Sequence, residues 1–87
     1  MDNVFMCGSV ESSDVLVKYT KTESPLKIVI ESKVIYQFGD EIKHLSAQYC
    51  KEIGLTKGEL FLNDQGAIPA VLKARILGVV DKMKGDK

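Results

Sequence analysis

The sequence predicts a two-layer α+β domain, in which a small antiparallel or mixed sheet is covered on one face by two helices. Two observations carry this prediction. Residues 15–31 alternate apolar and polar side chains on either side of one polar break, which is typical of strands with one buried face. The stretches 32–54 and 68–83 instead repeat apolar residues every three or four positions, as amphipathic helices do. Two helices on one side of a sheet bury both helical stripes and one sheet face.

The predicted order is strand, strand, helix, strand, helix, and it begins with two strands around a polar segment. Residues 15–20 place alternate apolar side chains on one face, and the alternation resumes at Leu26 after the polar segment 21–25. Serine and proline in that segment are turn-forming residues, so the two runs are predicted to form an antiparallel hairpin. A further strand can precede this pair at residues 4–7.

The two helices are predicted from their caps and stripes. The first begins after Ser32, a good N-cap, and ends at Gly54, which suits a left-handed C-cap. The third strand of the order follows at 59–62, before the turn residues 63–66. The second helix carries Pro69 in its first turn, where proline is tolerated. The apolar stripes of the two helices consist of Val34, Phe38, Ile42, Leu45, Tyr49 and Ile53, and of Ile68, Leu72, Ile76, Val79, Val80 and Met83.

Length and charge limit the possible functions. With 87 residues, of which twelve are basic and twelve acidic, the chain is expected to be a single domain, 1–87, with a formal net charge of zero. That balance argues against nucleic-acid binding, which normally needs a basic face. No apolar run approaches the roughly 20 residues of a membrane span, and the first seven residues lack a signal-peptide pattern. We therefore expect a cytoplasmic protein with neither a nucleic-acid nor a membrane partner.

Side chains suited to catalysis or metal binding are few. Cys7 and Cys50 form no CxxC pair and His44 is the single histidine, so no metal site is expected. Two free thiols are favoured over a disulfide in a reducing compartment, and Cys50 is interpreted as a small hydrophobic residue. His44 lies at the edge of a helical stripe, whereas Lys73 and Arg75 are assigned to the solvated face of the last helix. No activity is expected from this chain alone.

The sheet face opposite the helices is not wholly polar. The alternation places Leu16, Val29 and Phe61 on that face, and Phe5 can join them. An apolar patch on the uncovered face of a small domain often marks a docking surface. Scattered apolar residues on a surface are also ordinary, so both interpretations stay open.

The segment 8–14 is short and polar, and it comes immediately before the most strongly patterned strand. Its serines and Asp14 can simply bond the backbone and form a turn, which composition alone favours. The functional interpretation is an exposed serine hydroxyl between the carboxylates of Glu11 and Asp14. A neighbouring carboxylate that accepts its proton would activate such a hydroxyl for attack on a phosphoanhydride.

Three separated segments together resemble the citrate lyase acyl carrier protein family, the γ subunit of that enzyme. Residues 8–15, GSVESSDV, resemble the E-S-G-D turn that precedes a strand in this family. The sequence QFGDEI at 37–42 is similar to its Q-F-G-D-x-I helix motif. Residues 64–68, DQGAI, and 72–75, LKAR, resemble its D-K-G-A-L and L-R-A-R segments. The segments occur in the family's order and span most of the chain.

The resemblance implies a carrier subunit rather than an enzyme. The matching serine is Ser12, flanked by Glu11, Ser13 and Asp14. In the family this serine is joined through a phosphodiester to 2′-(5″-phosphoribosyl)-3′-dephospho-CoA, a prosthetic group whose thiol carries an acetyl group. The implied partners are the acyltransferase (α) and lyase (β) subunits, which exchange acetyl for citryl and cleave citrate to oxaloacetate in citrate fermentation. A further implied partner is the transferase that attaches the cofactor.

Two positions depart from the family pattern. Ser13 stands where the motif has glycine, which makes Ser13 the rival attachment residue and strains the turn if a positive φ is needed. Pro69 replaces the acidic residue that follows G-A-L in the family. An alternative within the resemblance is the acyl carrier subunit of malonate decarboxylase, which has a similar G-S-G-D turn. An alternative outside it is an interaction module without cofactor, docking through the open sheet face.

Overall fold

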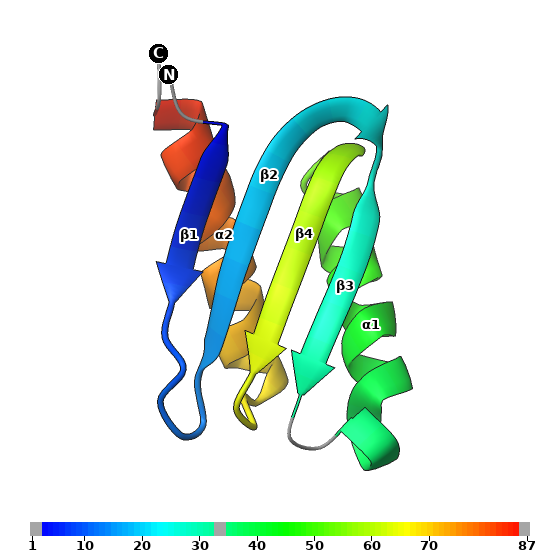
Figure 1. Ribbon diagram of the computed structural model, residues 1–87, viewed down its shortest axis with the longest axis vertical. Helices are drawn as coiled ribbons and strands as arrows, with labels where there is room; N and C mark the ends of the chain where they lie inside the picture. Colours follow the sequence, from blue (N-terminus) through cyan, green and yellow to red (C-terminus); the bar gives the residue numbers. More distant parts are fainter. Residues whose placement is uncertain (1–2, 33–34, 86–87) are drawn as a thin grey trace.

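Six elements of secondary structure follow one another in the computed structural model, which describes residues 3–32 and 35–85 (Figure 1). They are β1 (Val4–Gly8), β2 (Val15–Pro25), β3 (Lys27–Ser32), α1 (Ile35–Glu52), β4 (Lys57–Asp64) and α2 (Pro69–Gly85). The α+β prediction is confirmed, and β1 is the further strand that the sequence allowed. Val34 and the side chain of Phe38, both in the predicted helical stripe, lie outside the described residues.

The sheet has the strand order β1-β2-β4-β3. β4 pairs antiparallel with β2 and parallel with β3, so Leu62 lies beside both Val17 and Ile30. The sequence predicted an antiparallel hairpin between the strands that are β2 and β3 in the structure. That pairing is wrong, because β4 is inserted between them. A parallel pair needs a crossover connection, and α1 provides it between β3 and β4.

The polar segment 21–25 is strand rather than the predicted loop. β2 continues through it and curves over the start of β4, where Pro25 pairs with Lys57 (Figure 1). Leu26 alone separates β2 from β3, and its amide donates to the carbonyl of Thr56. The polar side chains of 21–25 are exposed, so their composition reflects solvent contact and not a turn.

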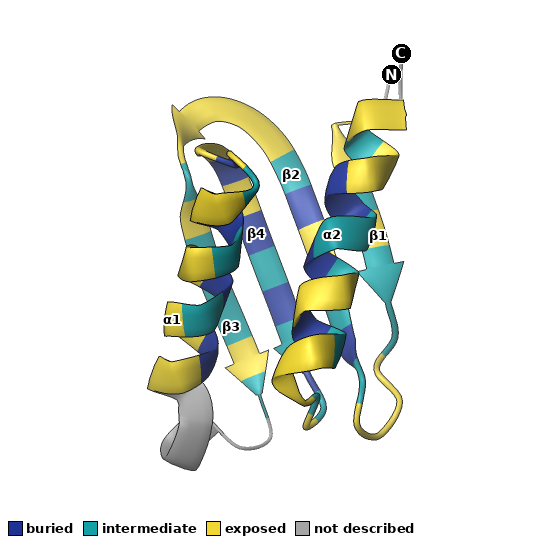
Figure 2. Cartoon of the chain, turned by 180° about the vertical axis from the view of Figure 1, so that it is seen from behind, coloured by how far each residue is buried: buried dark blue, intermediate teal, exposed yellow. Residues whose placement is uncertain are grey.

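Helices α1 and α2 lie on one face of the sheet and bury it (Figure 2). The buried hydrophobic residues come from β2, α1, the α1–β4 connection, β4 and α2: Val15, Val17, Tyr19, Ile42, Cys50, Leu55, Leu60, Leu62, Leu72, Ile76, Val79 and Val80. Cys50 is buried in this core, which confirms its interpretation as a small hydrophobic residue, and burial raises the pKa of its thiol to about 11. The first helix ends as predicted, with Gly54 in the left-handed region (φ +78°).

The uncovered face carries the apolar residues that alternation placed there, with one correction. Phe61 pairs with both Lys18 and Val29, which puts these side chains on the open face. Phe5 pairs with Tyr19 and so faces the helices, against the prediction. Its neighbours Val4 and Met6 take the open face instead, both exposed. Within 3–32 and 35–85, no helix is long and apolar enough to cross a membrane.

Candidate functional site

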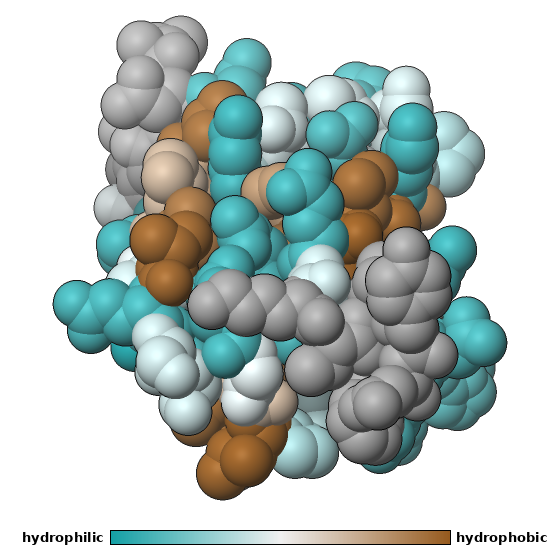
Figure 3. Space-filling model, turned by 60° about the horizontal axis from the view of Figure 1, so that its bottom comes forward, coloured by the Kyte–Doolittle hydropathy of each residue, from teal (hydrophilic) through white to brown (hydrophobic). Residues whose placement is uncertain are grey.

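The loop between β1 and β2, residues 9–14, lies at the end of the sheet where β4 ends and α2 begins (Figure 1). Gly8 starts this loop with φ +97°, and a Cβ there would lie 1.9 Å from the carbonyl oxygen of Val15. The two strands therefore approach so closely that only glycine fits. Residues 10–13 are exposed, including both candidate serines. Figure 3 turns this end of the molecule forward and shows a hydrophilic surface interrupted by separate hydrophobic spots.

An ion pair fixes the C-terminal part of the loop to α2. Arg75 donates to both carboxylate oxygens of Asp14, from Nε to Oδ1 at 3.0 Å and from Nη2 to Oδ2 at 2.9 Å. The same carboxylate accepts from the Ser9 hydroxyl at 2.7 Å and from the Val15 amide at 2.8 Å. Asp14 is 15% exposed at its side chain and Arg75 is 39% exposed. Bidentate, charge-assisted pairs of this kind fix orientation as well as position.

These bonds change the acidity of both partners. The hydrogen bonds from Arg75, then Ser9 and Val15, lower the pKa of Asp14 from its ordinary 3.8 to about 2. The Asp14 carboxylate in turn raises the pKa of Arg75. Because the folded pKa of Asp14 is the lower one, its contribution to stability is present above about pH 4 and is lost as pH falls toward 2. The assignment of Arg75 to a solvated helix face is therefore wrong, whereas Lys73 is exposed as predicted.

Backbone bonds tie the loop to the turn that follows β4. The amide of Ser13 donates to the carbonyl of Gln65, and the amide of Gln65 donates to the carbonyl of Asp14, each at 2.9 Å. A third bond runs within the loop, from the Asp14 amide to the Glu11 carbonyl at 3.1 Å. Ser12 lies in the exposed turn between Glu11, whose carbonyl accepts the bond from Asp14, and Ser13, whose amide bonds to Gln65. The four residues that the sequence singled out, Ser12 and its neighbours, all lie in this loop.

Ser13 has φ +69° and is the one non-glycine residue with a positive φ among those described. This is the left-handed region, which disfavours residues with a Cβ. The glycine of the family motif would be relaxed at this position, so the strain that the sequence predicted for a positive φ applies to Ser13.

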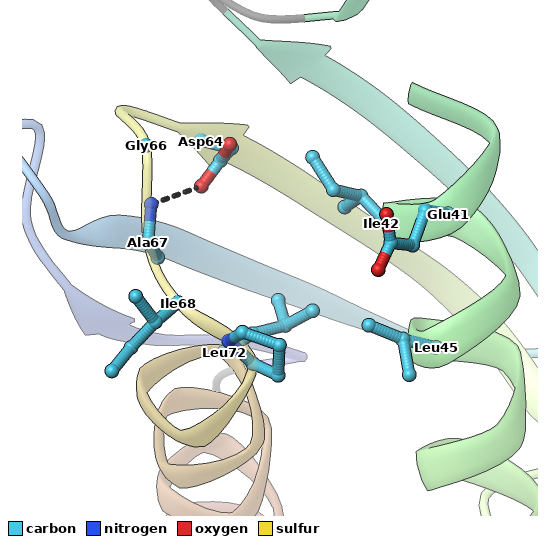
Figure 4. Close-up of a pocket in the computed structure, with 9 residues that line it drawn as sticks. Glu41, Ile42, Leu45, Asp64, Gly66, Ala67, Ile68 and Leu72 are labelled. Carbon is cyan, nitrogen blue, oxygen red and sulfur yellow. Dashed lines mark hydrogen bonds between the residues drawn. The ribbon is translucent and has the colours of Figure 1, made fainter. Parts of the chain in front are cut away.

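A cavity of about 330 Å³ opens beside the same turn, between α1 and the start of α2 (Figure 4). Its lining residues are Glu41, Ile42, Leu45, Asp64, Gly66, Ala67, Ile68, Pro69 and Leu72. Asp64 is 2% exposed and its carboxylate accepts from the Ser32 hydroxyl at 3.0 Å and the Ala67 amide at 2.9 Å. Sequence reasoning missed this cavity because its walls come from segments that no local pattern connects.

The remaining chemical candidates lie apart from the loop. His44 is exposed on α1, in agreement with its interpretation as a solvated helix residue. Cys7 and Cys50 are free thiols, the first half-buried and the second buried. The described residues contain no group of three or more His, Cys, Asp or Glu side chains that could hold a metal ion.

Known proteins match most of this chain. The family model described as ACP, malonate decarboxylase delta subunit (MdcD), matches residues 2–83. The citrate lyase acyl carrier protein of Pectobacterium atrosepticum is 40% identical over 75 residues, covering 86% of this chain and 78% of that protein. The citrate lyase acyl carrier protein of Rhodopseudomonas palustris is 32% identical over 77 residues, covering 88% and 79%.

A solved structure shares the fold. One chain in the crystal structure of a Pseudomonas malonate decarboxylase hetero-tetramer in complex with malonate superimposes with a TM-score of 0.71. The superposition covers 93% of this chain and 84% of that chain at 20% identity. Together with the sequence matches, it defines the class as that of the acyl carrier proteins. Within this class the chain belongs to the citrate lyase acyl carrier protein family, as its motifs predicted.

Removing the guanidinium of Arg75 should break its ion pair with the Asp14 carboxylate. In Arg75→Ala the pKa of Asp14 should rise from about 2 toward 3.8, because its first and strongest hydrogen-bond donor is gone. The pKa is measured from the carboxyl carbon shift in an NMR titration. Lys73→Ala, an exposed cation two positions earlier on α2, is the matched control and should leave the pKa of Asp14 unchanged. An unchanged pKa in Arg75→Ala would contradict the assigned cause.

Replacing Ser13 by glycine should stabilise the protein. Glycine relieves the left-handed strain but has a larger unfolded-state entropy, so we expect a net gain of about 0.5–1 kcal/mol in the free energy of unfolding. Urea denaturation measures it. Ser12→Gly is the control: without a positive φ to relieve, it should leave stability unchanged or lower it slightly. Equal effects of the two substitutions would show that Ser13 is not strained.

Proposed function

We propose that this chain is the acyl carrier subunit of citrate lyase, and that Ser12 carries phosphoribosyl-dephospho-CoA as a phosphodiester, making it a modified phosphoserine. The observation that supports this most is the geometry of the β1–β2 loop. Ser12 is exposed, while the residues after it are held by backbone bonds to Gln65 and by the ion pair to Arg75. A carrier needs such a site, because the attachment residue must be fixed while a long arm moves freely.

The loop has room for the group. Ser12 and its neighbours Glu11 and Ser13 are all exposed, so an arm joined to the Ser12 oxygen leads directly into solvent. When bound, the group supplies a thiol that carries the acyl group as a thioester. The chain supplies the position of that thiol, and tethering gives it a high effective concentration at each partner's site.

The two carboxylates beside Ser12 are proposed to have different roles. A carboxylate with a pKa of about 2 is a weak base, so Asp14 is a poor acceptor for the Ser12 proton. Its role is to fix the loop through Arg75. Glu11 is exposed, and its charge repels the phosphodiester by about 1 kcal/mol at 4 Å in water. That repulsion directs the start of the arm away from the loop.

The proposed partners provide the chemistry that this chain lacks. An acyltransferase (α) subunit exchanges the acetyl group for citryl, so that acetate leaves and a citryl thioester forms. A lyase (β) subunit then cleaves the citryl group, which releases oxaloacetate and restores the acetyl carrier. A separate transferase attaches the arm to Ser12. Citrate fermentation by such a complex is a cytoplasmic process, so we place the protein there.

The acyl carrier subunit of malonate decarboxylase is the second candidate function. It is favoured by the description of the matching family model, whereas the curated relatives are citrate lyase carriers. The similar crystal structure does not decide between them, because 20% identity supports the shared fold alone.

Expression with the attaching transferase should add one arm to the wild-type chain, seen as a single mass increase by intact mass spectrometry. Ser12→Ala should show no adduct, because the attacking hydroxyl is lost. Ser13→Ala is the matched control and should be modified normally. An unmodified wild-type chain would overturn the carrier proposal. An adduct that persists in Ser12→Ala and disappears in Ser13→Ala would move the site to Ser13.

Substrate choice separates the two carriers. Reconstituted with the citrate lyase α and β subunits, the modified chain should support release of oxaloacetate from citrate, measured with malate dehydrogenase and NADH. Reconstituted with malonate decarboxylase subunits, it should release little carbon dioxide from malonate. Release of carbon dioxide from malonate, without release of oxaloacetate from citrate, would assign the chain to malonate decarboxylase.

A further inference from the structure

The cavity between α1 and the start of α2 lies across the turn after β4 from the loop that carries Ser12. The Ser13 amide bonds to the carbonyl of Gln65, and the next residue, Gly66, already lines the cavity. The attachment residue and the cavity wall are therefore held together by the same turn. A long flexible group joined to Ser12 can fold back over this turn and place its free end in the cavity.

The walls of the cavity suit an uncharged group. Most of the lining is apolar, with Ile42 and Leu45 from α1 on one side, and Ile68, just before α2, and Leu72 of α2 on the other (Figure 4). Ile68 is 63% exposed, so its side chain is open to contact with an incoming group. A volume of about 330 Å³ is at the small end of ligand pockets, so it holds only part of a larger molecule.

The charged residues of the cavity are both acidic. Asp64 and Glu41 lie on opposite sides of it (Figure 4), and none of the nine lining residues is basic. The Asp64 oxygens already accept bonds from Ser32 and Ala67. Asp64 therefore offers negative charge and not a donor to an incoming anion. A ligand with its own carboxylate is repelled here, and none of the nine described lining residues supplies a compensating cation.

We propose that this cavity binds the uncharged acetyl-thioester end of the arm attached at Ser12 and excludes the same end when the acyl group carries carboxylates. This inference rests on the proposed function. The acyl group then selects between two positions of the arm, docked in the cavity or free in solvent. Only the acetyl form gains favourable contacts in the docked position. The acetyl carrier is sheltered between reaction cycles, and the carboxylated carrier is released for the partner that cleaves it.

The test compares three forms of the modified chain, each verified by intact mass: free thiol, acetyl thioester and malonyl thioester. Malonyl differs from acetyl by one carboxylate, so it isolates the effect of charge. Relative to the unmodified chain, the acetyl form should shift the backbone NMR signals of 41–45 and 66–72, while the malonyl form should leave them in place. Equal shifts for both acyl groups, or shifts confined to the β1–β2 loop, would overturn the proposal.

Variants of the cavity sharpen the comparison. Ile68→Glu puts a carboxylate on an exposed lining residue and should abolish the acetyl-dependent shifts. Val4→Glu is the matched control, an exposed β-branched residue on the open sheet face that should retain them. Glu41→Gln removes one of the two negative charges and should let the malonyl form produce part of the acetyl pattern. No gain in Glu41→Gln would contradict exclusion by charge.

The outcomes keep this inference separate from the proposed function. A missing adduct overturns the carrier proposal itself, whereas an adduct without acetyl-dependent shifts at the cavity overturns only the docking of the arm. Shifts at 66–72 that arise on adding an acyltransferase subunit, and that do not depend on the acyl group, would assign the cavity to that partner and overturn the inference.

Discussion

The bidentate pair between Asp14 and Arg75 is the interaction on which the site depends. It joins residues 61 positions apart and connects the β1–β2 loop to the middle of α2. It also explains why two sequence motifs occur together, since the aspartate comes from the E-S-S-D segment and the arginine from L-K-A-R. Without the guanidinium, the Asp14 carboxylate would keep only its bonds from Ser9 and Val15, both local. The loop would then keep its backbone bonds to Gln65 in the turn after β4 but lose its side-chain connection to α2.

The loop is held in a conformation that local preferences oppose. Ser13 adopts a positive φ although its Cβ disfavours it, and Gly8 allows a backbone approach that no other residue permits. The bonds between Ser13, Asp14 and Gln65 offset this strain, because they pair backbone groups that the turn would otherwise leave open. As a result, the residues that follow Ser12 are held by hydrogen bonds, while Ser12 itself faces solvent.

Local pattern predicted the elements of this fold, but not how they pair. Alternation located β2 and β3 because one face of each is buried against the helices, and it failed at the hairpin because insertion of β4 is decided by long-range packing. Phe5 was misplaced for the same reason, since only pairing with Tyr19 sets its face. The motif located the candidate serine, whereas helical periodicity could not show that Arg75 reaches the loop. The cavity depends on three separate segments and leaves no local signal.

A small carrier must place its functional surface at one end of the body. Here the β1–β2 loop, the turn after β4 and the cavity all lie at the end opposite the start of β1 and the last turn of α2 (Figure 1). The core is already filled by the residues that join sheet and helices, so little interior remains for a catalytic pocket. Arg75 neutralises Asp14, and Glu11 is left as the exposed charge next to Ser12. The proposed phosphodiester at Ser12 would therefore meet negative charge at the loop, and the mainly apolar cavity lies only beyond the turn. This arrangement favours an arm that leaves the surface at its root and returns by its uncharged end.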